Sequence, residues 1–159
     1  SSQPIQLDAA RYEMLPLGQE VLSPYVKPNE QGEPLFRLPG TQAHPLPYLG
    51  YAPGAYMGRA VEQVLKASAT PVHLDRIYET DMSEGLKAMA LEGHGIAFLP
   101  ASAVRRELRG KRLVSAGQGL DTALDIRIYR ERPGTRKAKG SVDAFWNDLE
   151  KHLAATAKA

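Results

Sequence analysis

The hydrophobic positions of this chain follow two periodicities that alternate along most of its length. Apolar residues recur at helical spacing in residues 56–67, in a stretch that opens near residue 81, in residues 102–108 and in residues 141–154. Alternating or wholly apolar runs indicate strands at residues 21–26, 48–51, 72–78, 96–99, 112–115 and 124–129. Strands that alternate with helices predict an α/β fold with parallel strand pairing.

The ends of the helices carry recognisable signals. Asp81 is a good N-cap with Glu84 three residues later, so the second helix is expected to open at Asp81. Gly93 is expected to stop that helix at its C′ position, and Gly95 to give a tight entry into the apolar strand at 96–99. The last helix is expected to bury a stripe formed by Val142, Phe145, Trp146, Leu149 and Leu153.

Prolines dominate the first third of the chain. Eight of them lie between residues 16 and 53, and proline lacks the amide donor that a helix interior needs. Long helices are therefore excluded there. Pro24 is expected to place the strand at 21–26 at a sheet edge or at a crossover between lobes.

Composition narrows the class of protein. The 159 residues suffice for one domain or two small lobes, and 43% hydrophobic with 24% charged residues excludes disordered, collagenous and coiled-coil chains. Cysteine is absent, which excludes disulfides, thiolate zinc sites and cysteine nucleophiles. No apolar run approaches the ~18 residues that span a bilayer, so no membrane partner is expected.

The net charge of +2 gives no overall basic field of the kind that holds DNA phosphates. Residues 105–112 and 127–139 are the densest basic stretches. We interpret them as a solvated face and a linker, with a partner or nucleic-acid contact as the alternative.

Catalytic and metal-binding patterns are scarce. The four histidines are scattered without metal-ligand spacing, and neither a Gly-x-Ser-x-Gly elbow nor a phosphate-binding P-loop occurs. The sequence therefore predicts no enzyme, no metal site and no cofactor.

Residues 50–59 form the most suggestive candidate for a ligand site. They leave the carboxyl end of a predicted strand and enter a helix, which is where open α/β sheets bind ligands. Free amides at the helix start suit an anion, and Tyr51, Tyr56 and Arg59 add stacking, hydrogen bonding and charge. The alternative is an ordinary loop whose tyrosines cover the core and whose arginine is solvated.

Met57 and Met82 each fall in the first turn of a helix that follows a predicted strand. Methionine on an apolar stripe is usually a packing residue. A thioether beside a cleft is also open to oxidation, which converts it into a polar sulfoxide.

One part of the sequence resembles the effector domain of LysR-type transcriptional regulators. It comprises Met82 to Pro100, Val104, residues 107–108 and residues 113–114. The likeness rests on a helix, a Gly-x-Gly-Ile turn, an apolar strand ending in Leu-Pro, a second helix and a Leu-Val strand. It covers nearly the whole chain and implies a two-lobed, periplasmic-binding-protein-like α/β fold with mostly parallel sheets. Residues 1–22 and 120–159 would belong to an incomplete first lobe, and residues 23–119 to the second.

The same resemblance implies an effector-sensing domain with no catalytic role. We expect a small-molecule effector or an oxidant to contact a cleft, and we expect its ligand-binding residues to be Tyr51, Tyr56, Arg59, Ser83 and Phe98. DNA would be bound only through an N-terminal helix-turn-helix that this fragment lacks. The intact protein would be cytoplasmic and a homodimer or higher homo-oligomer.

Residues 29–36, 56–59 and 81–84 are also similar to a hypochlorite-responsive branch of this family, in which methionine oxidation is the signal. By that likeness Met57 and Met82 are the redox-sensing candidates, with Met57 the more influential. The alternative from another class is a solute-binding protein of a transport system that binds a small anionic ligand. A helix-turn-helix upstream would favour the regulator, and an export signal there would favour transport.

Overall fold

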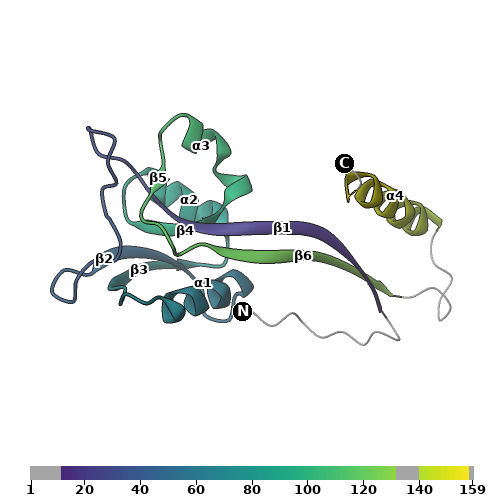
Figure 1. Ribbon diagram of the computed structural model, residues 1–159, viewed down its shortest axis with the longest axis horizontal. Helices are drawn as coiled ribbons and strands as arrows, with labels where there is room; N and C mark the ends of the chain where they lie inside the picture. Colours follow the sequence, from purple (N-terminus) through teal and green to yellow (C-terminus); the bar gives the residue numbers. More distant parts are fainter. Residues whose placement is uncertain (1–11, 132–139, 158–159) are drawn as a thin grey trace. The chain divides into compact units, whose positions relative to one another are not determined.

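The computed structural model describes residues 12–131 and 140–157 and confirms the α/β class (Figure 1). Its strands are β1 (Tyr12–Val26), β2 (Leu46–Tyr51), β3 (Leu74–Thr80), β4 (Ile96–Pro100), β5 (Val114–Ser115) and β6 (Thr122–Glu131). Its helices are α1 (Tyr56–Ala67), α2 (Ser83–Leu91), α3 (Arg105–Arg109) and α4 (Gly140–Ala157), with the 3₁₀ turn η1 (Ala101–Ala103) before α3.

The chain divides into two compact units. Unit 1 contains residues 20–124, and unit 2 contains residues 4–19 and 125–159, of which the structure describes 12–19, 125–131 and 140–157. β1 and β6, which pair with each other, each contribute residues to both units. Unit 1 holds every other strand and the first three helices.

The sheet has the strand order β3-β2-β4-β1-β5. β2 pairs in parallel with β3 and with β4, whereas β1 pairs antiparallel with β4 and with β5. The connections from β2 to β3 and from β3 to β4 cross the sheet in opposite directions. Because parallel crossovers are right-handed, α1 and α2 lie on opposite faces of the sheet, as Figure 1 shows.

The core of unit 1 lies around the central strands. All five residues of β4 are buried, as expected for a strand that is apolar on both faces. The helix at residues 56–67 is confirmed as α1, and Ala60 and Val61 of its apolar stripe are fully buried. Leu86 and Ala90 of α2 join the same cluster.

Two glycines behave as the sequence predicts. Gly93 follows the C-cap of α2 with φ +86°, a conformation that glycine adopts without strain. At Gly95 a Cβ would lie 2.7 Å from the carbonyl oxygen of Pro47, so a side chain there would separate β4 from β2. The tight entry into β4 therefore requires glycine.

The prediction that Pro24 lies at a sheet edge is wrong, because β1 runs between β4 and β5. The Pro24 carbonyl accepts the Ala116 amide at 3.0 Å, on the side that faces β5. The nitrogen of a strand residue points to the same side as its carbonyl, so the missing donor faces the two-residue strand β5. The ladder between β1 and β4 keeps its hydrogen bonds. The alternative expectation, a strand that crosses between lobes, agrees with the passage of β1 through both units.

The expected N-cap at Asp81 is also wrong. α2 begins at Ser83, its N-cap is Met82, and no side chain caps it. The Met82 amide instead donates to the Thr80 hydroxyl at 3.3 Å, which keeps the chain extended for one residue longer. The expected helix at residues 102–108 is a 3₁₀ turn followed by the short α3, since Val104 interrupts the helical conformation.

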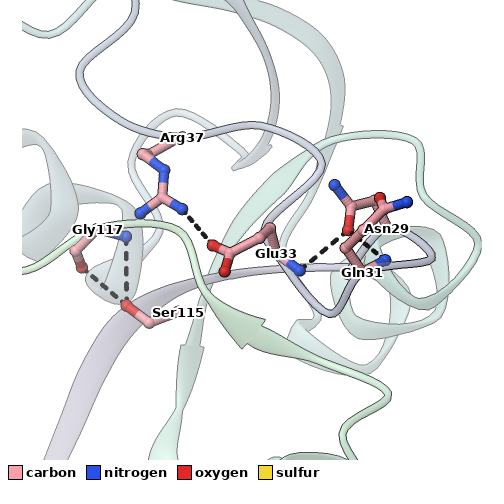
Figure 2. Close-up of polar contacts among 6 residues, drawn as sticks. All are labelled: Asn29, Gln31, Glu33, Arg37, Ser115 and Gly117. Carbon is pink, nitrogen blue, oxygen red and sulfur yellow. Dashed lines mark hydrogen bonds and ion pairs between the residues drawn. The ribbon is translucent and has the colours of Figure 1, made fainter.

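The loop between β1 and β2 contains hydrogen bonds from side chains to its own backbone amides (Figure 2). The Asn29 carboxamide oxygen accepts the amides of Gln31 and Glu33 at 2.9 and 3.0 Å. Arg37 pairs with Glu33 at 2.6 Å on the exposed side. Local side-chain acceptors of this kind satisfy backbone donors where prolines prevent a ladder.

Unit 2 is held by contacts around Trp146 of α4, which is almost fully buried. The Arg130 guanidinium lies 4.7 Å from the Trp146 ring centroid and donates to Glu13 at 2.7 Å. Phe145 was expected on the buried stripe, but 62% of it is exposed. On a helical projection it lies at the edge of the stripe opposite Trp146, so packing centred on Trp146 leaves it outside. The Val142 side chain lies outside the described residues.

Replacing Leu86 with Ala is expected to lower the free energy of unfolding by about 2–5 kcal/mol, because it empties a fully buried site in the core. The same change at Leu108, which is exposed on α3, should cost about 0.5 kcal/mol. Urea denaturation followed by circular dichroism measures both values. Equal losses for Leu86→Ala and Leu108→Ala would contradict this description of the core.

Candidate functional site

The segment that joins β2 to α1 is built by backbone hydrogen bonds. β2 ends at Tyr51, and the Ala52 amide donates to the Thr80 carbonyl at the end of β3. Gly54, with φ +86°, turns the chain so that the Ala55 amide reaches the Ala52 carbonyl. α1 then begins without any side-chain cap and without an acidic residue in its first turn. Its first amides therefore remain suited to an anion.

A small cavity of about 120 Å³ lies beside this segment. Both Tyr51 and Arg59 of the predicted site line it, together with the turn at residues 52–54, Gly58, Tyr48, Glu62 and Arg76. We call it the β2–α1 cavity. Tyr56, Ser83 and Phe98 do not line it. Tyr56 and Ser83 are half-buried at the starts of α1 and α2, and Phe98 is fully buried in β4.

Tyr51 is a core residue as well as a wall of the cavity. Its side chain is 2% exposed, and its hydroxyl donates to the Phe98 carbonyl at 2.8 Å. Burial raises the pKa of Tyr51 above its usual value, so the hydroxyl remains a neutral donor. A Cβ on Gly58 would lie 3.1 Å from the Tyr51 Cβ, so the first turn of α1 packs closely against the end of β2.

Arg76 is the residue of this cavity that the sequence analysis missed. Its guanidinium donates to the Tyr51 carbonyl at 2.7 Å, lies 3.4 Å from the Glu79 carboxylate and sits 5.3 Å from the Tyr48 ring centroid. Gly50 makes room for it, since a Cβ there would lie 2.9 Å from the guanidinium. Burial raises the pKa of Tyr48 to about 12, although the positive charge of Arg76 acts in the opposite direction.

A signal for Arg76 exists in the sequence. In the alternating strand it falls in phase with the apolar positions Leu74 and Tyr78, where a solvated arginine is out of place. Arg59 differs from Arg76: it is exposed on α1, and its guanidinium makes no hydrogen bond or ion pair within the residues that the structure describes. The cavity thus contains one cation, Arg76, that is held by protein groups, and one cation, Arg59, that can contact a ligand.

The two redox candidates lie in different environments. Met82, the N-cap of α2, is 65% exposed. Met57 is half-buried in the first turn of α1 and packs against the main core cluster. Met89, in the body of α2, also packs against that cluster, whereas Met14 is 45% exposed.

Neither a metal-ligand cluster nor a helix suited to span a membrane occurs among the described residues. No group of three or more histidine or acidic side chains there is placed to hold a metal ion. None of the described helices is long and apolar enough to cross a lipid bilayer.

Among known proteins, the chain is similar to the transcriptional regulator YjiE of Escherichia coli strain K12, a regulator of the helix-turn-helix type. The two are 33% identical over 140 residues, which is 88% of this chain and 44% of YjiE. The chain therefore spans about half the length of the curated relatives that it matches.

Solved structures agree with this likeness. The regulatory domain of HypT from Salmonella typhimurium, in its apo form, superposes with a TM-score of 0.84 at 29% identity, covering 96% of this chain and 70% of that one. Full-length HypT, described as a hypochlorite-specific LysR-type transcriptional regulator, gives a TM-score of 0.78 at 30% identity, covering 91% of this chain and 47% of the regulator.

The family model of the LysR substrate binding domain matches residues 2–154, nearly the whole of the sequence. The chain belongs to the LysR substrate-binding domain family and is a regulatory, effector-binding domain of the LysR type.

Proposed function

We propose that this chain controls DNA binding and transcription by a longer LysR-type regulator. The observation that carries the proposal is the alignment with full-length HypT, in which 91% of this chain accounts for 47% of the regulator. DNA contacts then belong to a helix-turn-helix outside residues 1–159. The regulator acts in the cytoplasm and this domain catalyses no reaction.

We assign residues 23–119 to the second lobe of the regulatory domain and residues 1–22 and 120–159 to the first. The division of the chain near residues 20 and 124 supports this assignment. We also propose that the regulator is a homo-oligomer. Ile77 and Tyr78 are exposed on β3, which lies at one end of the described strand order, and exposed apolar side chains on an edge strand favour association.

The proposed effector is a small anion that enters the β2–α1 cavity. Arg59 supplies a cation without a fixed partner in the described residues, and the uncapped start of α1 supplies amide donors. A volume of about 120 Å³ accommodates a ligand of a few heavy atoms, since a water molecule occupies about 30 Å³. Tyr51 forms the cavity wall, and Phe98 fixes Tyr51 through its carbonyl.

Tyr56 and Ser83 complete the proposed ligand-binding set for a larger effector. They lie at the starts of the helices that follow β2 and β3, two strands that pair in parallel. Because the carboxyl ends of parallel strands meet at one edge of a sheet, both residues belong to the edge where such sheets bind ligands.

An oxidant response through methionine is the second part of the proposal, and it rests on the likeness to HypT. Met57 packs against the core, so its sulfoxide would place a polar group among apolar neighbours at a cost of about 1–3 kcal/mol. That range suffices to shift two states separated by a few kcal/mol. Met82 is already largely in water, and its oxidation changes less.

The regulatory role is tested by electrophoretic mobility shift with operator DNA. The chain alone is expected to give no sequence-specific, salt-dependent shift, because its net charge is only +2 and the proposed helix-turn-helix lies outside it. The full-length gene product should shift the operator. Sequence-specific operator binding by residues 1–159 alone would overturn the proposal.

Arg59→Ala is expected to weaken acetate binding about two- to fivefold, the scale of one exposed charge pair. The measurement is a titration of the backbone amide resonances of residues 56–58 by NMR. Lys66→Ala removes the same charge from the other end of α1 and should leave the titration unchanged. Equal titrations in the wild-type chain and in Arg59→Ala would move the site away from Arg59.

Met82 is expected to oxidise before Met57 under limiting hypochlorite, because more of it is exposed. The effect on operator affinity should be larger for Met57 than for Met82, which is the opposite of the order of oxidation. In the full-length regulator, Met57→Gln as a sulfoxide mimic should change operator affinity, and Met82→Gln should leave it near the wild-type value. Peptide mass spectrometry measures which methionine oxidises first, and operator titration measures how much each variant changes operator affinity. A response to Met82→Gln with none to Met57→Gln would contradict the role of Met57.

A further inference from the structure

A second pocket lies between α2 and α3, away from the β2–α1 cavity. It is an open hollow of about 490 Å³ beside η1. Its charged or hydroxyl-bearing lining residues are Glu84, Lys87, Ser102, Arg105, Arg106, Arg109 and the buried Glu107. We call it the α2–α3 pocket. Figure 1 shows the two helices next to each other, and an ion pair joins them.

The ion pair between Lys87 and Glu107 neutralises one positive and one negative charge of the pocket lining. Lys87 and Glu107 lie 2.6 Å apart, with only 18% and 7% of their side chains exposed. The hydrogen bond from Lys87 holds the pKa of Glu107 below its usual value, so the carboxylate is charged. Their charges cancel each other, and the remaining wall consists of three arginines against the single carboxylate of Glu84.

The arginines are available for a ligand. All three are exposed, and the guanidinium groups of Arg106 and Arg109 make no hydrogen bond or ion pair within the described part of the chain. Arg105 and Arg109 are four residues apart on α3, so their side chains point to the same side. Like charges at this spacing repel, and an anion between them relieves the repulsion.

One residue of the pocket wall, Ser102, already binds a carboxylate from the neighbouring strand β1. Glu20 of β1 accepts the Ser102 hydroxyl at 2.6 Å and the Ser102 amide at 3.2 Å. Burial raises the pKa of Glu20, but these hydrogen bonds and the charge of Arg105 lower it overall. The Ser102 hydroxyl and amide can therefore donate to an oxyanion, and Glu20 competes with any that enters.

We propose that the α2–α3 pocket binds a small molecule that carries two or more anionic oxygen groups. Arg105 and Arg109 contact these groups, and the ligand competes with Glu20 for Ser102 and Arg105. The site is independent of the effector cavity. Its ligand acts on the strand β1, because Glu20 is the residue at which β1 enters unit 1.

The test is isothermal titration calorimetry of the full chain with inorganic pyrophosphate and with citrate, at low salt. Saturable binding of either probe is expected, and the tighter one identifies phosphate or carboxylate as the preferred group. The double change Arg105→Gln and Arg109→Gln should weaken binding about fivefold. The double change Lys27→Gln and Lys66→Gln removes the same two charges outside the pocket and should not change binding. Added salt should weaken binding, since the arginines are exposed.

Removal of the Glu20 carboxylate, which competes with the ligand, should strengthen binding of the probes. Glu20→Ala should tighten binding about twofold, and Glu20→Gln, which keeps the size and one acceptor, tests the same point if the alanine variant unfolds. Circular dichroism checks the fold of each variant. Three results would overturn the proposal: no saturable binding of either probe, binding indifferent to both arginines, or arginine-dependent capture of duplex DNA without binding of either small probe.

Discussion

The close approach of β4 to β2 at Gly95 is the constraint on which unit 1 depends. Any side chain there would meet the Pro47 carbonyl at 2.7 Å, and the fully buried strand Ile96–Pro100 would lose its place beside β2. With β4 in position, the Phe98 carbonyl receives the Tyr51 hydroxyl, and β1 pairs along the other side of β4. One glycine thus permits both the parallel and the antiparallel half of the sheet.

Both candidate binding regions follow from that sheet. β2 and β4 are parallel, so their carboxyl ends lie at the same edge, where ligands of α/β proteins commonly bind. The turn after β2 leads to the start of α1 and to Arg59, and the turn after β4 leads to Ser102 and the arginines of α3. Each region offers cations with no fixed partner in the described residues. Both proposed anion sites therefore lie at one edge of the sheet, and Tyr51 belongs both to the first of them and to the core.

The sequence predicted what local pattern determines and missed what distant residues decide. The apolar stripe of residues 56–67 defined α1 to the residue, and two glycines marked the end of α2 and the entry to β4. The expected N-cap at Asp81 is wrong because α2 begins only at Ser83, and the Thr80 hydroxyl accepts the Met82 amide just before the helix begins.

The remaining differences depend on tertiary contacts. Pro24 lies inside the sheet because β5 is only two residues long, which no local pattern reveals. Of the candidate site, Tyr51 and Arg59 share a cavity, but Arg76 reaches it only because β3 lies beside β2. The family was identified from the motif in residues 82–114, and the comparisons confirm it.

We propose that this domain and a DNA-binding segment elsewhere in the regulator control each other. Coupling between two binding sites is reciprocal, so operator DNA must change the domain if the domain changes operator binding. Hydrogen exchange of the full-length regulator, with operator and with scrambled DNA, tests this directly. We expect operator DNA, and not scrambled DNA, to change hydrogen exchange in peptides covering residues 52–67, at the β2–α1 cavity. Identical exchange throughout residues 12–157 under both conditions would contradict it.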